Sequence, residues 1–474
     1  MPVPGSARLP VIDYGNMVAG RIEPGETGPG GIDPARLEGD LAVRFREAGR
    51  VMEARRDAGE LGFLELPHDD RLVRRTLEGA GALRGRFDDV VVVGIGGSAL
   101  GTVALRDALL GPWWNALDGE KRGGAPRLHV LDNPDPDAAT ALLDRLDLAR
   151  TVFNVVSKSG LTAETLALFL VVRARMEEAL GAGRAGEHLV VTTDARRGPL
   201  REVAAECGLR SLPVPRAVGG RFSVLSPVGM LPAALCGIDI EAVLGGAAAM
   251  AERCADLELA ANRAGVLATL LHDADAGVGA GIQVFMPYAD RLRGLAYWVQ
   301  QLWAESLGKA VRTDGSRAET GPTPLPAFGA ADQHSILQLL MEGPRDKVVV
   351  FIGRGRVERD LMIPWAFQEE PAFSYLGGHT LHGLLDSERR ATAEALRRAG
   401  RMNMTIMMDQ IDAHTVGALF MLFQCAVVHA GALYGVDPLD QPGVEEAKTL
   451  TCGLLGRDGF DPPDLPRPHS RWRV

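Results

Sequence analysis

The sequence has few cysteines, few lysines and no excess of positive charge. Five of its 474 residues are cysteine, and they are scattered without a C-x-x-C pair. This pattern argues against a disulfide framework or a zinc knuckle, and it is typical of a reducing cytoplasm. Lys and Arg number 51 against 61 Asp and Glu, which gives a formal net charge of −10. We therefore expect no nucleic-acid or anionic-membrane partner, although a locally positive pocket can still bind a small anion.

The sequence also shows no targeting segment. Residues 1–8 contain no charged region followed by an apolar run, so we predict no signal peptide and a cytoplasmic location. Residues 416–436 are apolar almost throughout and are about long enough to span a bilayer. Gln424 and His429 interrupt this stretch, and small residues are frequent in it. We interpret it as a buried core helix and expect no membrane association.

From residue 89 onward, short apolar runs alternate with longer amphipathic segments. The pattern predicts strands at 90–93, 127–131, 152–156, 188–193 and 210–214, with helices between them. After a largely helical stretch at 223–261 the rhythm resumes, with strands at 281–286, 347–352 and 402–408. Repeated βαβ units imply parallel sheets with helices on both faces. The fold class is therefore α/β, with two doubly wound parallel-sheet units, each a Rossmann-like three-layer sandwich.

The same pattern predicts how the chain is divided. A length of 474 residues is typical of about three domains. The Gly- and Pro-rich first forty residues predict an irregular arm, and the Pro- and Arg-rich tail after 456 predicts a surface segment. The expected parts are an N-terminal arm and helix (1–60), a first α/β domain (61–217), a helical connection (218–275), a second α/β domain (276–440), and a C-terminal helix and tail (441–474).

The first candidate site is the loop after the predicted strand 90–93. It reads Gly94-Ile95-Gly96-Gly97-Ser98-Ala99 and formally matches the dinucleotide fingerprint G-x-G-x-x-G/A. The acid expected about 20 residues later is missing, because the nearest acid at a strand end is Asp132. A tight turn that needs glycine for packing is about as good an interpretation as NAD binding.

The second candidate loop, at 157–165, follows the predicted strand 152–156. It supplies three hydroxyls, from Ser157, Ser159 and Thr162, together with Lys158 and a glycine at one helix N-terminus. These groups and the free amides of a helix start are what a phosphate monoester requires. A Ser/Thr helix cap with a capping-box Glu is the alternative interpretation, and it accounts for only one or two of these residues.

Four further segments carry ionisable groups that have an ordinary structural interpretation when taken singly. They contain Arg221 in VGGRFS, Glu305 in QLWAESLGK, His334 in DQHS and Lys448 in DQPGVEEAK. Together with GIGGS at 94–98 and SKSGLTAET at 157–165, they resemble the glucose-6-phosphate isomerase (phosphoglucose isomerase) family, in the family's order. The resemblance covers about residues 89–455, whereas the first forty residues and 311–331 match nothing recognisable.

The resemblance implies two sugar-isomerase (SIS) domains, a homodimer, no cofactor, no metal, and interconversion of glucose 6-phosphate and fructose 6-phosphate. It implies that Ser157, Ser159 and Thr162 hold the phosphate beside Lys158, that Gly97, Ser98 and Gln301 touch the sugar, and that Gln441 lines the site. It also implies roles for four ionisable residues. Glu305 would be the base, Arg221 would stabilise a cis-enediolate, and His334 and Lys448 would assist ring opening, with His334 entering from the partner subunit.

The chemistry of aldose–ketose isomerisation agrees with these residue types. It needs a carboxylate that moves a carbon-bound proton, a fixed cation near the enediolate oxygens, and an acid/base for ring opening. Three of the five lysines, Lys158, Lys309 and Lys448, lie within the matched motifs, and Lys309 has no role that the sequence assigns. Two competing hypotheses are an NAD-dependent dehydrogenase using the Gly94 loop and a non-enzymatic SIS-fold sensor of a sugar phosphate.

Overall fold

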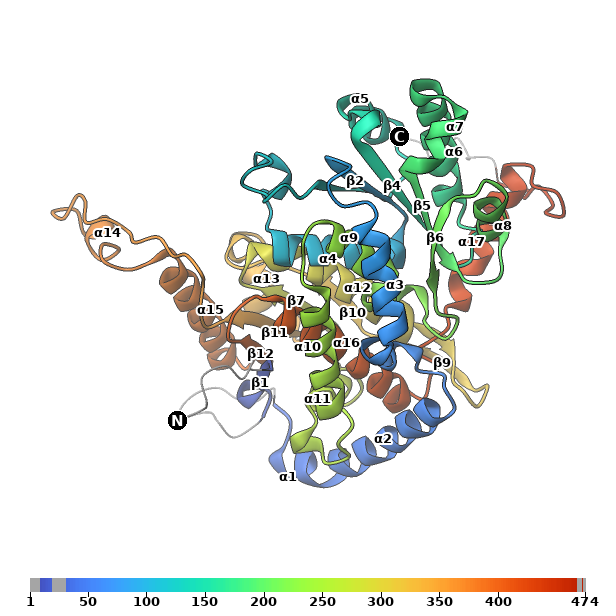
Figure 1. Cartoon of the computed structure of the whole chain (residues 1–474). Helices are drawn as coiled ribbons and strands as arrows, with labels where there is room; N and C mark the ends of the chain where they lie inside the picture. Colours follow the sequence, from blue (N-terminus) through green and yellow to red (C-terminus); the bar gives the residue numbers. More distant parts are fainter. Residues whose placement is uncertain (1–8, 19–30, 467–470, 472–474) are drawn as a thin grey trace.

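The computed structural model describes residues 9–18, 31–466 and 471 (Figure 1). The expectations for residues 1–8, for most of the glycine-rich arm at 19–30 and for the end of the tail lie outside the described residues. Within them, two five-stranded sheets organise the molecule. Both arise from the segments in which the sequence predicts βα units, so the predicted fold class is confirmed.

The first sheet is entirely parallel and has the order β3-β2-β4-β5-β6. Its strands are β2 (Asp89–Val93), β3 (Arg127–Leu131), β4 (Thr151–Val156), β5 (Leu189–Asp194) and β6 (Arg210–Val214). Each lies within about one residue of its predicted range. Alternate residues of β2 pack into different hydrophobic clusters, Val90 and Val92 into one and Val91 and Val93 into another. Both faces of the sheet are therefore covered, as a doubly wound fold requires.

The connections of this sheet create a switch point between β2 and β4. The chain runs from β2 to β3 on one side and then crosses to β4 on the other, and Val93 pairs with Val155 where the two strands end. Helix α4 (Leu100–Leu105), after β2, packs into the first cluster, and α6 (Ala163–Leu180), after β4, packs into the second. The two loops diverge to opposite faces, and this is where doubly wound sheets bind ligands.

The second sheet has the order β1-β12-β11-β7-β10. The predicted strands are present as β7 (Ile282–Pro287), β11 (Lys347–Arg354) and β12 (Asn403–Met408), all parallel. The sequence missed both edge strands. The arm that we predicted to be irregular supplies β1 (Val11–Asp13), antiparallel to β12, and β10 (Thr323–Pro326) pairs parallel with β7. Three residues are too few for an alternation signal, and the two prolines of β10 are tolerated because an edge strand leaves one side unpaired.

The remaining elements cover these sheets or connect them. The helices of the first half are α1 (Pro34–Arg36), α2 (Ala42–Asp57), α3 (Asp70–Gly81), α5 (Pro136–Arg145), α7 (Ala182–Ala185), α8 (Pro199–Glu206), α9 (Pro227–Leu235), α10 (Ile240–Arg253) and α11 (Arg263–Ala276). Those of the second half are α12 (Arg293–Leu307), α13 (Leu337–Glu342), α14 (Pro371–Ser374), α15 (Leu381–Arg398), α16 (Ala413–Tyr434) and α17 (Glu445–Leu454). Strands β8 (Lys309–Val311) and β9 (Arg317–Thr320) form a small antiparallel pair that the sequence also missed.

Helix α16 is the central helix of the largest hydrophobic cluster. Among the described residues it is the one helix that is long and apolar enough to cross a membrane, but 89% of its most apolar stretch is buried inside the molecule. Helices α2, α10, α11 and α12 pack around it. The prediction of a buried core helix at this position is confirmed.

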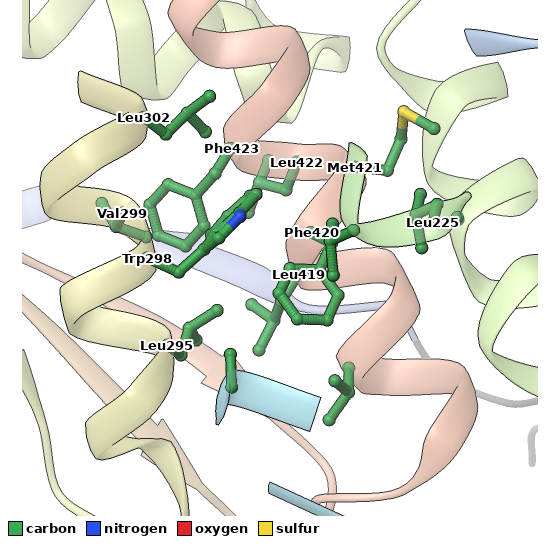
Figure 2. Close-up of a cluster of buried hydrophobic side chains, with 14 of the residues drawn as sticks. Leu225, Leu295, Trp298, Val299, Leu302, Leu419, Phe420, Met421, Leu422 and Phe423 are labelled. Atoms are coloured by element: carbon green, nitrogen blue, oxygen red, sulfur yellow. The ribbon is translucent and has the colours of Figure 1, made fainter. Parts of the chain in front are cut away.

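Helix α12 is fixed by an apolar stripe that faces α16. Leu295, Trp298, Val299 and Leu302 recur at i, i+3, i+4 and i+7, and Figure 2 shows them packed against residues of α16. The ring of Trp298 meets that of Phe420 edge-on, with the ring centroids 4.8 Å apart. This packing sets the rotation of α12 about its axis, and therefore the direction in which its polar face points.

A long excursion between β11 and α15 leaves the body of the molecule. It carries α14 and projects at the left of Figure 1. Met362 and Thr380 form a bridge at its base. We call residues 361–380 the projecting arm. Six of its large apolar side chains are 52–73% exposed: Leu361, Met362, Trp365, Phe367, Phe373 and Tyr375.

Candidate active site

The loop after β4 forms a compact turn at the N-terminus of α6. The Ser157 and Thr162 hydroxyl oxygens lie 2.9 Å apart, and Ser157 Oγ accepts a hydrogen bond from the Gly160 amide. Gly160 has a φ of +65°, a conformation that favours glycine. Thr162 is the N-cap residue of α6, yet its side chain makes no capping hydrogen bond. The alternative interpretation of this loop as a Ser/Thr cap is therefore wrong for Thr162, and the first amides of α6 remain available to an anion.

Lys158 lies in this loop and is held by the backbone. Its Nζ donates to the carbonyl oxygen of Arg216 at 2.8 Å, which joins the loop to the segment leading into Arg221. Burial lowers the pKa of the Lys158 ammonium, and the Asp194 carboxylate partly offsets this effect. The half-buried side chain therefore supplies a positive charge in the loop that carries the three hydroxyls.

The Gly94 loop packs closely against the turn that carries Arg221 and against the Gln301 side chain of α12. A Cβ on Gly97 would lie 2.4 Å from the carbonyl carbon and oxygen of Gly220, and one on Gly96 would lie 2.8 Å from Gln301 Nε2. Ser98 ends the short 3₁₀ turn that these glycines form. Packing against the turn that carries Arg221 and against α12 is thus what requires glycine here, as the packing interpretation of the motif predicts.

Arg221 is the centre of a hydrogen-bond network in which all five of its N–H donors have acceptors. Its Nε donates to Ser306 Oγ at 2.7 Å, and its Nη1 donates to Gln441 Oε1 at 2.8 Å and to Glu305 Oε2 at 3.3 Å. Its Nη2 donates to the carbonyl oxygens of Pro438 and Asp440. The residue is 3% exposed. Burial lowers the pKa of the guanidinium and the Glu305 carboxylate raises it, but arginine stays charged in proteins.

Glu305 is held from both sides while part of its carboxylate stays open. It follows Gln301 by one helical turn on the polar face of α12, and Gln301 Nε2 donates to Glu305 Oε1 at 2.9 Å. The other oxygen faces Arg221, so the carboxylate lies between an amide and a guanidinium. The Glu305 side chain is 32% exposed, whereas that of Arg221 is 2% exposed. Gln301 Oε1 is buried without a hydrogen-bond partner.

The sequence missed three residues that hold this network together. Ser306 is fully buried and accepts from Arg221. Lys309 donates to the Glu305 carbonyl oxygen and to Asp440, whose own carbonyl also accepts from Arg221. All three lie inside matched motifs, next to residues that the sequence singled out. Their position in the sequence beside Glu305 and Gln441 could have pointed to them. Sequence alone, however, does not show which neighbouring side chains contact the network.

Two of the predicted residues do not join the network within one chain. Lys448 lies on α17, 61% exposed, and its Nζ donates to Glu445 at 2.7 Å. His334 is exposed at the end of a 3₁₀ turn, and its ring makes no hydrogen bond within the described part of the chain. Its neighbour Gln333 is tied to Thr392 and to the Glu388 carbonyl oxygen of α15.

The other predicted residues fall into two groups that meet at the switch point. Gly97, Arg221, Gln301, Glu305 and Gln441 belong to one connected set of contacts, and Ser98 follows Gly97 in the same turn. Ser157, Lys158, Ser159 and Thr162 follow the neighbouring strand, and a Cβ on Gly94 would lie 3.0 Å from the Val156 carbonyl oxygen. A helix start with free amides, and a partly open carboxylate next to a buried guanidinium, both lie at the ligand-binding edge of doubly wound sheets, which is the arrangement of an enzyme that acts on a small molecule.

Comparisons with known proteins identify the particular family. Residues 72–456 match the phosphoglucose isomerase family. A glucose-6-phosphate isomerase of Rubrobacter xylanophilus is 45% identical over 433 residues, which cover 91% of this chain and 96% of the relative. A protein of the same name from Carboxydothermus hydrogenoformans is 40% identical over 451 residues, 95% of each chain. The chain belongs to the phosphoglucose isomerase family, so the resemblance seen in the motifs is confirmed.

Solved structures agree with this assignment at the level of the fold. A protein of Thermus thermophilus, described as hypothetical, superposes with a TM-score of 0.81 at 36% identity and covers 94% of this chain and 100% of its own. A glucose-6-phosphate isomerase from Chlamydia trachomatis has a TM-score of 0.71 at 24% identity, over 82% of this chain and 74% of its own. The prediction of two doubly wound α/β units is therefore confirmed at the level of the fold.

Proposed function

We propose that this protein is a glucose-6-phosphate isomerase, which interconverts D-glucose 6-phosphate and D-fructose 6-phosphate through a cis-enediolate. The observation that carries the proposal is the Glu305 carboxylate, held between Gln301 and Arg221 and partly open to a ligand. Family membership supports the reaction, and the hydroxyl-rich start of α6 supports a phosphorylated substrate.

The substrate phosphate would bind at the N-terminus of α6. Ser157, Ser159 and Thr162 would donate hydroxyl hydrogen bonds, the first amides of α6 would donate in addition, and Lys158 would contribute its charge nearby. Gly97, Ser98 and Gln301 would contact the sugar, where Gln301 Oε1 offers a buried acceptor without a partner. Gln441 would line the same space through its bond to Arg221.

The chemical step is a proton transfer that leaves the overall redox state unchanged. Glu305 removes the proton from C2 of the open-chain aldose, and the C1 carbonyl becomes part of an enediolate. The protonated carboxylic acid then returns the proton to C1, the hydroxyl proton of O2 passes to O1, and O2 becomes the new carbonyl oxygen. Arg221 stabilises the negative charge on the enediolate oxygens from a fixed position. The scheme uses no cofactor and no metal.

Ring opening would use His334 and Lys448, which lie outside the network of one chain. We propose that His334 acts from the partner subunit of a homodimer and that Lys448 approaches when α17 closes over the substrate. The projecting arm supports the dimer, because monomeric proteins rarely expose so many large apolar side chains in one place. The arm leads directly into α15, to which Gln333 is bonded, so the same part of the molecule carries both the arm and His334.

We make two further proposals that rest mainly on the sequence. One is the division of the chain at residues 60, 217, 275 and 440 into arm, two α/β domains, helical connection and tail. The other is a cytoplasmic location, which free cysteines support, since all five cysteines are unpaired.

A coupled assay tests the proposed reaction. Fructose 6-phosphate is supplied, and glucose 6-phosphate is followed through NADP reduction by added glucose-6-phosphate dehydrogenase. We expect steady NADPH formation that depends on this protein. A folded protein that binds 6-phosphogluconate without turnover would instead favour the sugar-phosphate sensor. Quenching of NADH fluorescence by the protein would favour the dehydrogenase hypothesis.

A further inference from the structure

Lys309 is a buried cation that the sequence left without a role. It follows Glu305 by four residues, just after α12 ends, and its side chain is 5% exposed. Its Nζ donates to the Glu305 carbonyl oxygen at 2.6 Å and to the Asp440 carbonyl oxygen at 2.7 Å. The Asp440 carboxylate lies 3.2 Å from the same nitrogen. The three protons of the ammonium thus have three oxygen acceptors, two of them on the backbone.

These contacts join the helix that carries Glu305 to the loop that carries Gln441. The Glu305 carbonyl is among the last of α12, so it has no amide partner within the helix, and a cation at this end is favoured by the helix dipole. The Asp440 carbonyl also accepts from Arg221 Nη2 at 2.9 Å. Lys309 and Arg221 therefore both donate to the Asp440 carbonyl oxygen, and Arg221 also contacts the Glu305 carboxylate.

We propose that Lys309 is a positioning residue for the isomerase reaction, one that fixes the Glu305 backbone against the 438–441 loop and so holds the carboxylate at the reacting carbons. This inference rests on the proposed role of Glu305 as the base. Lys309 does not touch the substrate in this account. Its effect is on the placement of Glu305, and a small misplacement of a reacting group costs a large factor in rate.

The test is Lys309→Met, which keeps an unbranched side chain of nearly the same length and removes its three donors. We expect kcat for fructose 6-phosphate to fall about 10- to 100-fold, with a smaller change in KM, because the phosphate loop is untouched. We further expect the primary isotope effect on kcat with glucose 6-phosphate deuterated at C2 to rise, since a displaced base makes proton transfer more rate-limiting. Should this variant fail to fold, Lys309→Gln replaces it with the same expected division between kcat and KM.

Lys347→Met is the matched control. Lys347 is likewise a poorly exposed lysine that pairs with an adjacent aspartate, Asp346, but it begins β11, outside the network of Arg221. We expect its kcat and isotope effect to equal those of the wild type. Unchanged kcat in Lys309→Met, a rise in KM alone, or a lower kcat with an unchanged isotope effect would overturn the inference. An inactive wild-type protein would refute the proposed function itself, and the wild type is therefore measured first.

Discussion

At the scale of single residues, Arg221 places a positive charge in the site at a fixed position. All five of its donors are engaged, two of them with backbone carbonyls of the 438–441 loop. A guanidinium held in this way cannot follow the substrate. In the proposed mechanism it would act as a fixed positive charge whose environment is already organised before the enediolate forms, and such preorganisation is what makes electrostatic stabilisation effective.

Replacing this arginine by lysine keeps the charge and removes most of the network. In Arg221→Lys, one ammonium must serve acceptors that five donors satisfied, so the cation shifts and the Pro438 and Asp440 carbonyls lose partners. We predict that kcat falls about 10²- to 10³-fold while the affinity for 6-phosphogluconate changes much less. Steady-state kinetics and calorimetric titration of the same preparation measure both quantities. A variant with wild-type kcat would show that the fixed geometry of Arg221 is unimportant.

Much of the candidate site was predictable at this scale because motifs such as VGGRFS and DQPGVE match those of the family residue by residue. What could not be predicted is which of them meet within one chain. Arg221, Glu305 and Gln441 do, whereas Lys448 pairs with Glu445 on an exposed helix and His334 makes no hydrogen bond to any residue that the structure describes. Ser306 and Lys309 were passed over because their importance lies in backbone and side-chain contacts between distant segments, which a motif does not display.

At the scale of elements, the packing of α12 on α16 determines where Glu305 points. Trp298 is buried against Phe420 at the middle of this contact (Figure 2). We predict that Trp298→Ala lowers the free energy of unfolding by about 3–5 kcal/mol, as truncation of a buried Trp does. Trp113→Ala is the control, because Trp113 is 76% exposed, and its effect should stay within about 0.5 kcal/mol. Urea denaturation measures both, and equal effects would contradict the packing described.

A second prediction at this scale concerns acid stability and His429 of α16. The ring is buried and packs on Phe45, and neither nitrogen has a well-formed hydrogen bond, although the backbone of Cys254 lies near enough to oppose part of the effect of burial on the pKa. Burial lowers the pKa of His429 to about 4, below its ordinary value near 6.5. Between these values the unfolded chain binds the proton more readily, so stability is complete above about pH 6.5 and is lost as pH falls towards 4.

The change in free energy associated with this single histidine is on the order of 3 kcal/mol. We predict that His429→Leu, which cannot be protonated, loses this part of the pH dependence of unfolding. His68→Leu, at an exposed position, controls for the loss of a surface histidine. Denaturant unfolding at several pH values between 4 and 7 measures the free energy of unfolding of each variant. If this free energy falls equally with pH in wild type and His429→Leu, His429 is not the source of the acid sensitivity.

The elements themselves were mostly predictable, and the exceptions have a common physical cause. Central parallel strands such as β2 and β4 are continuous apolar runs because both of their faces are buried, and they stand out in the sequence. The edge strand β1 is three residues long, and β10 carries two prolines, so neither has an apolar period to detect. Their pairing depends on the neighbouring strand, which is information that no local pattern contains.

At the scale of the whole molecule, the proposed dimer places the two halves of a site on different chains. Mixing the inactive variants Glu305→Gln and His334→Ala tests this directly. In a mixed dimer, one site combines the intact Glu305 of one chain with the intact His334 of the other. After random exchange of subunits, we predict recovery of about a quarter of the wild-type activity. Mixtures that stay inactive although subunits have exchanged would show that His334 acts within its own chain.

The projecting arm supplies the corresponding structural prediction. Substituting Trp365 and Phe367 with serine removes two of its exposed aromatic side chains. Because these would be buried against the partner, we expect the double variant to sediment as a monomer and to lose activity while its thermal unfolding stays cooperative. A fully active monomer would contradict both the arm as an interface and His334 as a residue shared between subunits.

The most direct test of the account compares catalysis and binding in Glu305→Gln. The amide keeps the shape of the side chain but cannot accept a proton from carbon. We predict that turnover of fructose 6-phosphate falls about 10²- to 10⁴-fold or is abolished, whereas 6-phosphogluconate binds with near wild-type affinity. Near-normal turnover in this variant would contradict the central claim that Glu305 is the base.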